Sequence, residues 1–480
     1  MTPTTSNAAV HRARLARAVT TALIVLTSGT AHAAFFQLAE NSPAGLGNAN
    51  AGGAAVADDA STVWYNPAGL TRLQGQELVL GGHFIAPSFK ASRVSASTVA
   101  FPAVPFPPPY AAGSSTINGG NGGDAGESAL VPNFYYAHQY NDRLHFGLGV
   151  NAPFGLATDY ANDWAGRYHA DRSEIMTVNI NPTLAYKVNE AFSLGAGINY
   201  QQLEATLTQA VDFGSICAAV ALQASNPALL CGAQGSQASS GKAKVEADDD
   251  AWGYNFGFLW NLNSSTRFGL HYRSKLEYEL EGDFDITRPS GVTVSPVVTG
   301  ATGLVDSNAK ADVTLPAMLS LSAFAQLNPT WAVMGDITRT YWGDLPELRI
   351  EFDSTQNDSI VTLDLKDVNR YSVGATYTPG GAWMYRAGIA LDKTPTPNAT
   401  ARTPRLPDED RLWLSLGAGY KSSDKLQFDF AYTYIMVDDA KVEKTAGPLT
   451  AQDENTFRGN LTANYEGSTH VLSAQARWRF

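Results

Sequence analysis

Charged residues are scarce in this sequence, and long apolar runs are almost absent from it. Asp, Glu, Lys and Arg make up only 16% of the 480 residues, and no run of eighteen apolar residues follows the N-terminal segment. A bundle of membrane-spanning helices is therefore excluded, because each such helix needs about 20 mostly apolar residues. The 33 basic residues are outnumbered by 45 acidic ones, which argues against nucleic acid as a partner.

Aromatic residues and glycine, by contrast, are plentiful, with 21 Phe, 20 Tyr, 9 Trp and 43 Gly. Between Trp252 and Leu262 every second residue is apolar, whereas Gly253, Asn255 and Gly257 lie between them. A period of two is that of a β-strand. A soluble sandwich rarely gathers so many rings on one face, but a membrane barrel needs one face for lipid and another for its lumen. The pattern predicts a transmembrane β-barrel.

The same alternation recurs along the chain and predicts the topology. Short turns at 141–142, 189–190, 263–265, 328–329, 379–381 and 421–424 alternate with long polar stretches at 90–128, 153–173, 210–246, 287–309, 394–408 and 438–468. The predicted strands are 76–89, 129–140, 143–152, 174–188, 192–209, 247–262, 266–286, 310–327, 330–352, 360–378, 383–393, 409–420, 425–437 and 469–480. The expected fold is all-β, an antiparallel barrel of about fourteen strands. An even count places both termini in the periplasm.

The N-terminus has the three parts of a secretory signal peptide. Arg12, Arg14 and Arg17 form a basic region, residues 19–30 are mostly apolar, and Ala31-His32-Ala33 matches an A-x-A cleavage site. Residues 1–33 are therefore predicted to be removed, and the mature chain would begin outside the cytoplasm.

The C-terminus carries a signal of its own. Apolar residues alternate with polar ones from Leu472 to the final residue, Phe480. A terminal aromatic residue on an alternating strand resembles the insertion signal of bacterial outer-membrane barrels. We therefore expect the barrel-assembly machinery to recognise Phe480, and outer-membrane lipid and lipopolysaccharide to surround the barrel.

Residues 34–75 break the strand pattern. They are rich in small residues and have short helical tendencies. A barrel of about fourteen strands is too wide to be filled by its own side chains. These residues are therefore predicted to form a plug, or hatch, inside a barrel made by residues 76–480.

Several motifs resemble those of the FadL-type outer-membrane transporters of long-chain fatty acids, a family that includes aromatic-hydrocarbon channels. They are Phe36-Gln37-Leu38, Gly45-Leu46-Gly47, Ala57-Asp58-Asp59-Ala60, Asn66-Pro67-Ala68, Tyr186 with 193–197, Leu315-Pro316, Trp331-Ala332 and Pro407-Asp408-Glu409-Asp410-Arg411-Leu412-Trp413. The resemblance implies a fourteen-stranded barrel with an N-terminal hatch. It also implies passive transport, in which extracellular loops catch the ligand, a lumen pocket holds it, and it leaves sideways beside a kinked strand.

The resemblance also implies roles for individual residues. Phe36 matches an aromatic residue that lines the family's pocket, although packing within the hatch explains it equally well. Asn66, Pro67 and Ala68 match the hatch motif and are expected to form a turn close to the barrel wall.

The headgroup site of the family does not carry over. Fatty-acid carriers hold the carboxylate with lumen Arg and Lys residues, and the matching positions here are Gln209 and about Val361. Arg273 and Lys275, expected to face inward, are candidates to replace them; the alternative is that they pair with nearby glutamates. The ligand therefore stays open between fatty acids and neutral hydrophobic molecules.

The two cysteines, Cys217 and Cys231, lie in one predicted extracellular loop, where a disulfide persists. A bridge would enclose the apolar residues 218–222 and 227–230, and we expect these to form an exposed surface for ligand capture. The alternative is a structural staple. Asp248, Asp249 and Asp250 could hold a divalent ion or a cation that bridges lipopolysaccharide, but a solvated acidic rim is the simpler interpretation.

The predicted function is passive uptake of long-chain fatty acids or similar hydrophobic molecules across the bacterial outer membrane, and the alternative is a channel for aromatic hydrocarbons. An adhesive or structural barrel would not need a hatch. An outer-membrane hydrolase would need a Ser/His constellation, but no G-x-S-x-G or H-E-x-x-H motif occurs. We expect no enzyme activity, no cofactor and no metal.

Overall fold

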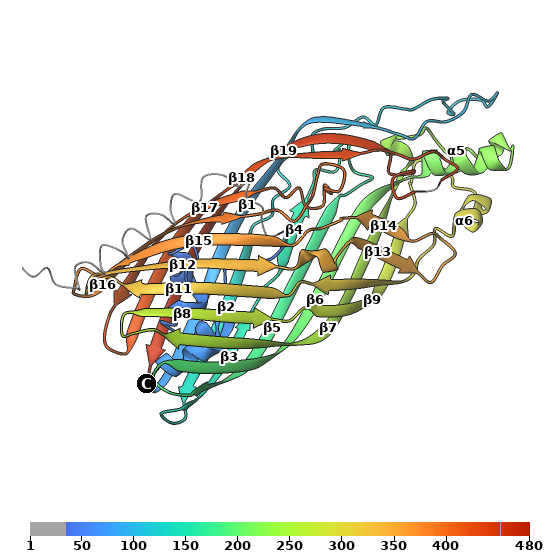
Figure 1. Ribbon diagram of the computed structural model, residues 1–480. Coiled ribbons are helices and arrows are strands. Elements are labelled where there is room, and N and C mark those ends of the chain that lie inside the picture. Colours follow the sequence, from blue (N-terminus) through green and yellow to red (C-terminus); the bar gives the residue numbers. More distant parts are fainter. Residues whose placement is uncertain (1–34, 452) are drawn as a thin grey trace, which may run out of the picture. The chain divides into compact units, whose positions relative to one another are not determined.

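The structure is a sheet of antiparallel strands closed on itself (Figure 1). A computed structural model describes residues 35–451 and 453–480, so the predicted signal peptide lies outside the described residues. The strands are β1 (Gln76–Ser97), β2 (Ala129–Gln139), β3 (Leu144–Asn151), β4 (Gly155–Asp159), β5 (Arg172–Lys187), β6 (Phe192–Asp212), β7 (Ser240–Asn261), β8 (Thr266–Arg273), β9 (Leu276–Thr287), β10 (Ser307–Leu315), β11 (Met318–Gln326), β12 (Trp331–Thr340), β13 (Glu347–Phe352), β14 (Ser359–Thr362), β15 (Val368–Tyr377), β16 (Trp383–Asp392), β17 (Arg411–Lys421), β18 (Leu426–Lys444) and β19 (Asn460–Arg479).

Five strands of the wall are interrupted, so nineteen segments make fourteen strands in the described part of the chain. The interrupted strands are β3/β4, β8/β9, β10/β11, β12/β13 and β14/β15. β1 pairs with β19 from Glu77 opposite Arg479 to Ser97 opposite Asn460, and this pairing closes the barrel. Closure leaves the outer edges of β1 and β19 paired with each other rather than open, as a membrane requires. The predicted fold class is confirmed.

The predicted strand ends are wrong on one side of the barrel. The largest extensions beyond the predicted limits are in four strands, to Ser97 in β1, from Ser240 in β7, to Lys444 in β18 and from Asn460 in β19. The predicted loops 90–128, 210–246 and 438–468 are correspondingly too long. The extended parts keep the ladder, but their outer face is polar, so the apolar alternation that marks a lipid-facing strand ends before the strand does.

Helices are short and fall in two groups. The first group lies inside the barrel near the C-terminus (Figure 1). It consists of α2 (Pro43–Leu46), α3 (Gly53–Val56), α4 (Thr62–Tyr65) and the 3-10 helix η2 (Pro67–Arg72). We call residues 35–75, which contain these four helices, the hatch segment. The second occupies loops at the other end, as α5 (Phe213–Gln223), η3 (Pro227–Leu229), η4 (Gln237–Ser239) and α6 (Pro296–Thr302), and η5 (Trp342–Asp344) joins two strands. None of the helices in the described ranges is long and apolar enough to cross a membrane.

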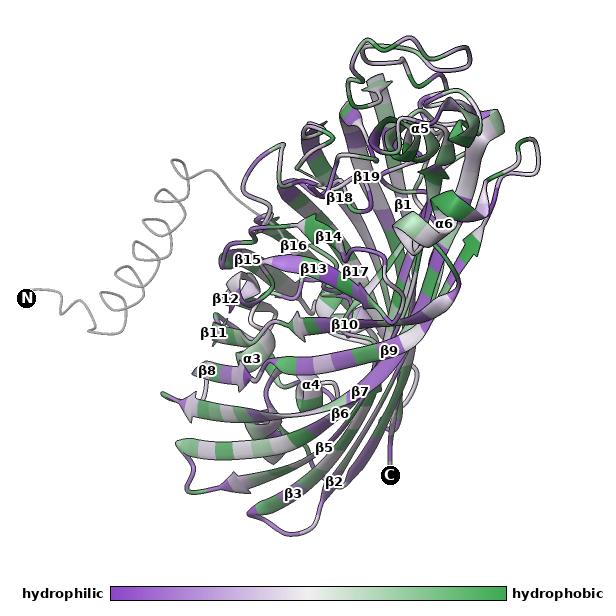
Figure 2. Ribbon diagram, turned by 90° about the vertical axis from the view of Figure 1, so that its right-hand side faces the viewer, coloured by the Kyte–Doolittle hydropathy of each residue, from purple (hydrophilic) through white to green (hydrophobic). Residues whose placement is uncertain are grey.

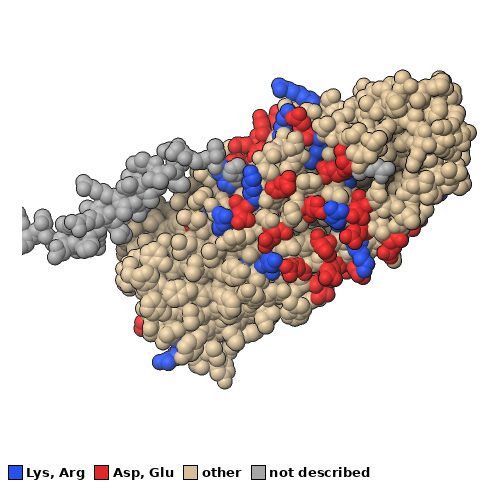
Figure 3. All heavy atoms as spheres, turned by 45° about the vertical axis from the view of Figure 1, so that its right-hand side comes forward, with Lys and Arg blue, Asp and Glu red and all other residues tan. Residues whose placement is uncertain are grey.

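The outer surface is divided into an apolar part and a charged part. Colouring by hydropathy shows apolar and polar residues alternating along the strands (Figure 2). Large apolar side chains such as Leu184, Leu194, Phe256 and Leu270 are exposed near the short turns. Charged side chains gather farther toward the loops (Figure 3), where ion pairs such as Lys310–Glu281 form. The apolar part is the surface that lipid would cover.

Candidate functional site

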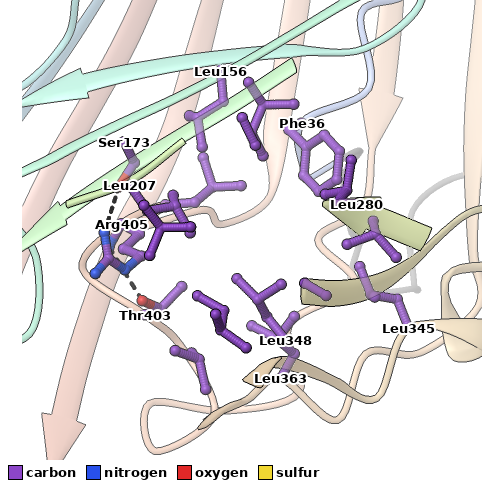
Figure 4. Close-up of a pocket in the computed structure, with 18 of the residues that line it drawn as sticks. Phe36, Leu156, Ser173, Leu207, Leu280, Leu345, Leu348, Leu363, Thr403 and Arg405 are labelled. Carbon is purple, nitrogen blue, oxygen red and sulfur yellow. Dashed lines mark hydrogen bonds between the residues drawn. The ribbon is translucent and has the colours of Figure 1, made fainter. Parts of the chain in front are cut away.

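The barrel lumen contains an apolar pocket between the hatch segment and the loops (Figure 4). The cavity between its lining atoms has a volume of about 90 Å³. The apolar lining comes from both halves of the barrel and consists of Phe35, Phe36, Leu156, Ile175, Leu203, Ala205, Leu207, Val245, Ala247, Leu280, Ala311, Val313, Leu345, Leu348, Ile350, Val361, Leu363 and Leu406. The remaining lining residues are Ser173, Thr403 and Arg405. Such a surface favours an apolar ligand, because binding removes the apolar surfaces of both the pocket and the ligand from water.

Phe36 lies at one end of this pocket and is buried. Its ring centroid is 5.1 Å from that of Trp342, 5.9 Å from that of Phe154 and 5.2 Å from that of Phe35. The structure therefore joins both interpretations of Phe36, since the same ring lines the pocket and packs in an aromatic cluster. Arg411 fixes the backbone here, because its Nη2 donates to the carbonyl oxygen of Phe35 at 3.0 Å.

The barrel wall is interrupted beside Phe36. β3 ends at Asn151 and β4 begins at Gly155, and β3 pairs with β2 only as far as Phe134 opposite Val150. Within the described residues β4 pairs along its length with β5 but not with β2. The predicted loop 153–173 is therefore partly strand. The strand that contains residues 144–159 leaves its neighbour after Val150 and meets the same neighbouring segment again at Thr158, which pairs with Gly126 just before β2.

The start of the hatch segment pairs with this interruption. Gln37 and Phe154 form an isolated antiparallel bridge. The amide of Leu38 donates to the carbonyl of Pro153 at 2.8 Å, and the amide of Gly155 donates to the carbonyl of Phe36 at 3.0 Å. The hatch segment thus supplies the wall strand with hydrogen bonds that β2 does not make there.

Asn66-Pro67-Ala68 lies directly against the wall, at glycine positions of β6 and β7. The Asn66 side chain donates to the carbonyls of Ala54, at 2.6 Å, and of Phe258, at 3.0 Å. A Cβ atom on Gly195 would lie 2.4 Å from the amide nitrogen of Ala68. The motif therefore links the hatch segment to the wall through a fully buried asparagine. Breaking this link would leave buried amide and carbonyl groups without hydrogen-bond partners, which is costly, so the hatch segment is held in one position against the wall.

Arg273 and Lys275 do not line the pocket. Arg273 faces inward as expected, but its guanidinium lies 3.8 Å from the Trp64 ring centroid and donates to the Trp64 carbonyl at 3.1 Å, and neither residue lines the pocket. Lys275 is on the outer surface and pairs with Glu277 at 2.7 Å, so its predicted inward orientation is wrong. The reason is the break between β8 and β9. Arg273 and Leu276 both face inward, so the break shifts the alternation by one residue.

A cation that the sequence did not reveal lies in the pocket instead. Arg405, in the loop between β16 and β17, is 8% exposed and lines the pocket opposite Phe36 in Figure 4. Its Nη1 donates to Ser173 Oγ at 3.0 Å and to the Thr208 carbonyl at 3.1 Å, and its Nη2 donates to Gln209 Oε1 at 2.8 Å. Its nearness to Pro407–Asp410 in the sequence was the one available signal.

The comparisons with known proteins agree with this geometry. The model of the family described as "Outer membrane protein transport protein (OMPP1/FadL/TodX)" matches residues 24–480. The chain belongs to this family. It is a family of outer-membrane transport proteins and not of enzymes, and its barrels carry hydrophobic compounds across the outer membrane.

Family members that match the chain include two sequence relatives of nearly equal length. The long-chain fatty acid transport protein of Escherichia coli (strain K12) is 30% identical over 442 residues, which cover 90% of this chain and 94% of the relative. The outer membrane protein P1 of Haemophilus influenzae is 30% identical over 463 residues, which cover 93% and 95% of the two chains.

Two solved structures of family members share the fold. The crystal structure of a Pseudomonas aeruginosa FadL homologue has a TM-score of 0.79 at 26% identity and covers 93% of this chain and all of that one. The P. putida toluene transporter TodX has a TM-score of 0.61 at 19% identity, covering 88% and 94% of the two chains, and shows the fold alone.

Cys217 and Cys231 form a disulfide in the structure, with Cα atoms 5.8 Å apart. The expectation that the bridge orders an exposed apolar surface is wrong. Ala218 and Ala221 of α5 are buried, and their clusters include Phe101 of one neighbouring loop and Val298 of another. The flanking loops cover the helix, so its apolar side chains form the core of a loop cluster.

Asp248, Asp249 and Asp250 lie on β7 and share an outer groove with three glutamates of β9, Glu277, Glu279 and Glu281. No group of His, Cys, Asp or Glu side chains with the arrangement of a metal site occurs in residues 35–451 and 453–480. The structure therefore shows an acidic outer surface and nothing that points to a bound ion.

Proposed function

We propose that this protein takes up long-chain fatty acids or similar hydrophobic molecules passively, with capture on extracellular loops, binding in the lumen pocket and lateral release past the hatch segment. One observation carries the proposal. Phe36 lines the pocket with its ring and pairs with the interrupted wall strand through its carbonyl oxygen. A single residue therefore connects the ligand site with the point at which the wall can open.

The route avoids returning an apolar ligand to water. Each methylene group of a fatty acid costs about 0.8 kcal/mol to hydrate, so release into lipid is strongly favoured over release into the periplasm. In the proposed route, movement of residues 36–38 breaks the two hydrogen bonds to Pro153 and Gly155 and uncovers the gap between β2 and β4. The exposed Leu130 of β2 would then meet the leaving ligand on the lipid side.

We propose that ligand is captured at the end of the barrel that carries α5 and α6. Most of the apolar residues of α5 are buried, but Val297 and Val305 in and beside α6 are exposed. These are large apolar side chains at the loop end of the molecule, above the charged outer surface. We assign the first encounter with ligand to this region rather than to the surface of α5.

We propose fatty acids, rather than aromatic hydrocarbons, as the ligand. The relatives at 30% identity include a long-chain fatty acid transport protein, whereas the toluene transporter is similar in fold alone. The aliphatic side chains that make up most of the pocket lining also suit the methylene chain of a fatty acid.

The orientation and surroundings of the barrel are part of the same proposal. Residues 1–33 act as the signal peptide, the short turns and both mature termini are periplasmic, and lipid and lipopolysaccharide surround the wall. The barrel-assembly machinery would recognise Phe480, which is exposed at the end of β19.

A deletion strain complemented with the wild-type gene tests the proposal. Growth is measured with long-chain fatty acids or with toluene as the carbon source. Growth on the fatty acids should require the gene. A complementing Phe36→Ala variant should bind palmitate about tenfold more weakly, because losing part of a buried Phe side chain removes roughly 1.4 kcal/mol of apolar contact. Growth that depends on the gene only with toluene would favour the hydrocarbon channel. Growth independent of it on every compound would contradict the proposal.

A further inference from the structure

The cation in the pocket is not neutralised by the protein. Within the described residues no carboxylate forms an ion pair with Arg405, although its side chain is more than nine-tenths buried. Asp171, the acidic residue whose field reaches Arg405, is itself paired with Lys242 at 2.6 Å. A buried charge without a partner is costly, which makes this arrangement unusual in an otherwise apolar pocket.

The charged groups that act on Arg405 include a basic side chain as well as Asp171. Arg458, in the loop between β18 and β19, is a second cation whose charge acts on Arg405. Burial, together with this repulsion, lowers the pKa of Arg405 to about 9. The guanidinium therefore stays protonated at neutral pH, and an anionic ligand would supply the ion-pair partner that it lacks among the described residues.

The hydrogen bonds of Arg405 leave one part of its guanidinium free. A guanidinium has five N–H groups. Three of them donate to Ser173, Thr208 and Gln209. The Nε–H and the second Nη2–H have no partner among the described residues, and together they match the two oxygens of a carboxylate. The three protein bonds hold the group in place, so little side-chain entropy remains to be lost on binding.

We propose that Arg405 binds the headgroup of a ligand that has a single carboxylate on an apolar tail. This inference rests on the proposed function and narrows it to fatty acids rather than neutral hydrocarbons. Gln209 and Val361, the positions expected to carry lumen cations, are neutral, but Gln209 Oε1 accepts from Arg405. The chain has thus placed its cation on a loop and uses the strand residue to position it.

The same geometry predicts where the apolar tail of the ligand lies. Phe36 lies opposite Arg405 in the pocket (Figure 4), so a carboxylate at Arg405 directs the tail toward Phe36 and the wall interruption. The rest of the lining is apolar apart from Ser173 and Thr403, which lie beside Arg405. Only one charged headgroup is accommodated, and an acid charged at both ends of its chain should bind poorly.

The test compares palmitate with 1-hexadecanol, which has the same chain length without the charge, on purified full-length protein. Arg405→Gln should weaken palmitate binding at least tenfold, with little change for the alcohol, and Arg405→Lys should restore part of the affinity. Gln209→Glu would give Arg405 a carboxylate of the protein's own and should weaken palmitate binding similarly, whereas Gln209→Leu should do so less. Arg349→Gln is the matched control, because Arg349 is half-exposed, does not line the pocket and is paired with Glu347 and Asp358.

The outcomes separate this inference from the function on which it rests. Unchanged palmitate binding in folded Arg405→Gln and Gln209→Glu proteins would overturn it, while uptake of hydrophobic compounds would stand. Equal losses for palmitate and hexadecanol would also overturn it, because Arg405 would then act on the pocket's structure. If wild-type protein bound neither compound, the proposed function would fail together with the inference.

Discussion

A Cβ atom on Gly257 would lie 1.9 Å from the side-chain oxygen of Asn66. The wall strand β7 and the hatch segment therefore meet so closely that only glycine fits at this position of the wall. The neighbouring strand β6 does the same with Gly195. Glycines on the inner face thus let the hatch segment approach the wall, while the aromatic residues between them face outward.

Replacing Gly257 with alanine should loosen this contact. The added methyl group has to displace Asn66 or the strand, and overpacking of this kind costs about 1–3 kcal/mol. The melting temperature of the purified protein should fall accordingly. Gly335→Ala in β12 is the control, because a Cβ there meets its nearest neighbour at 3.5 Å. Equal melting temperatures for the two variants would show that the close approach of Asn66 does not matter.

Asn66→Asp should lower uptake without unfolding the barrel. The substitution keeps the size of the side chain but replaces the amide that donates to Ala54 and Phe258, leaving buried oxygens facing one another. Loss of such buried bonds costs roughly 1–3 kcal/mol, and the strand ladder does not depend on them. The variant should still be heat-modifiable on a gel and take up less palmitate.

Asn141→Asp is the matched control for Asn66. Asn141 is exposed in a short turn, and its oxygen accepts from the amides of Arg143 and Leu144, a role that aspartate can also perform. Uptake by this variant should equal that of the wild type. Undiminished uptake by Asn66→Asp would remove the hatch segment from the mechanism, as would undiminished uptake after replacement of Asn66-Pro67-Ala68 by an unrelated tripeptide.

Removing the disulfide should affect the loop cluster and not the barrel. The bridge between Cys217 and Cys231 closes a short loop and, in the chain-entropy account, opposes local unfolding of that loop by about 3 kcal/mol, while the strand ladder of the barrel closes without it. The double variant Cys217→Ala and Cys231→Ala should become sensitive to proteolysis within residues 213–239 while keeping its melting temperature. Because most of α5 is buried, uptake at saturating ligand should hardly change. Free thiols in mass spectrometry of the non-reduced protein would contradict the bridge itself.

The strand count could be predicted from the sequence because lipid imposes a strict alternation on the wall. That constraint ends where the wall leaves the membrane, so the outer parts of β1, β7, β18 and β19 were not recognised as strand. The orientation of Lys275 was missed for a similar reason. A break of two residues after Arg273 reverses the alternation, and nothing in the local sequence marks it.

The pocket was less predictable than the wall. Phe36 and the hatch motif could be named because each belongs to a short local pattern. Arg405 could not, because its role depends on a loop that returns into the lumen and meets Ser173 and Gln209, which lie about two hundred residues earlier in the chain. Long-range contacts of this kind leave no periodic signal in the sequence.

Lateral release past the hatch segment is the central claim, and a reversible cross-link tests it most directly. Gln37 and Phe154 form a non-hydrogen-bonded antiparallel pair, in which Cα atoms lie roughly 4.5 Å apart and suit a disulfide. Gln37→Cys with Phe154→Cys, in protein that lacks Cys217 and Cys231, should take up almost no palmitate when oxidised and recover uptake on reduction. Because the same protein is compared in two states, loss of the Phe154 ring affects both equally. Equal uptake by the fully cross-linked and the reduced protein would contradict release through this gap.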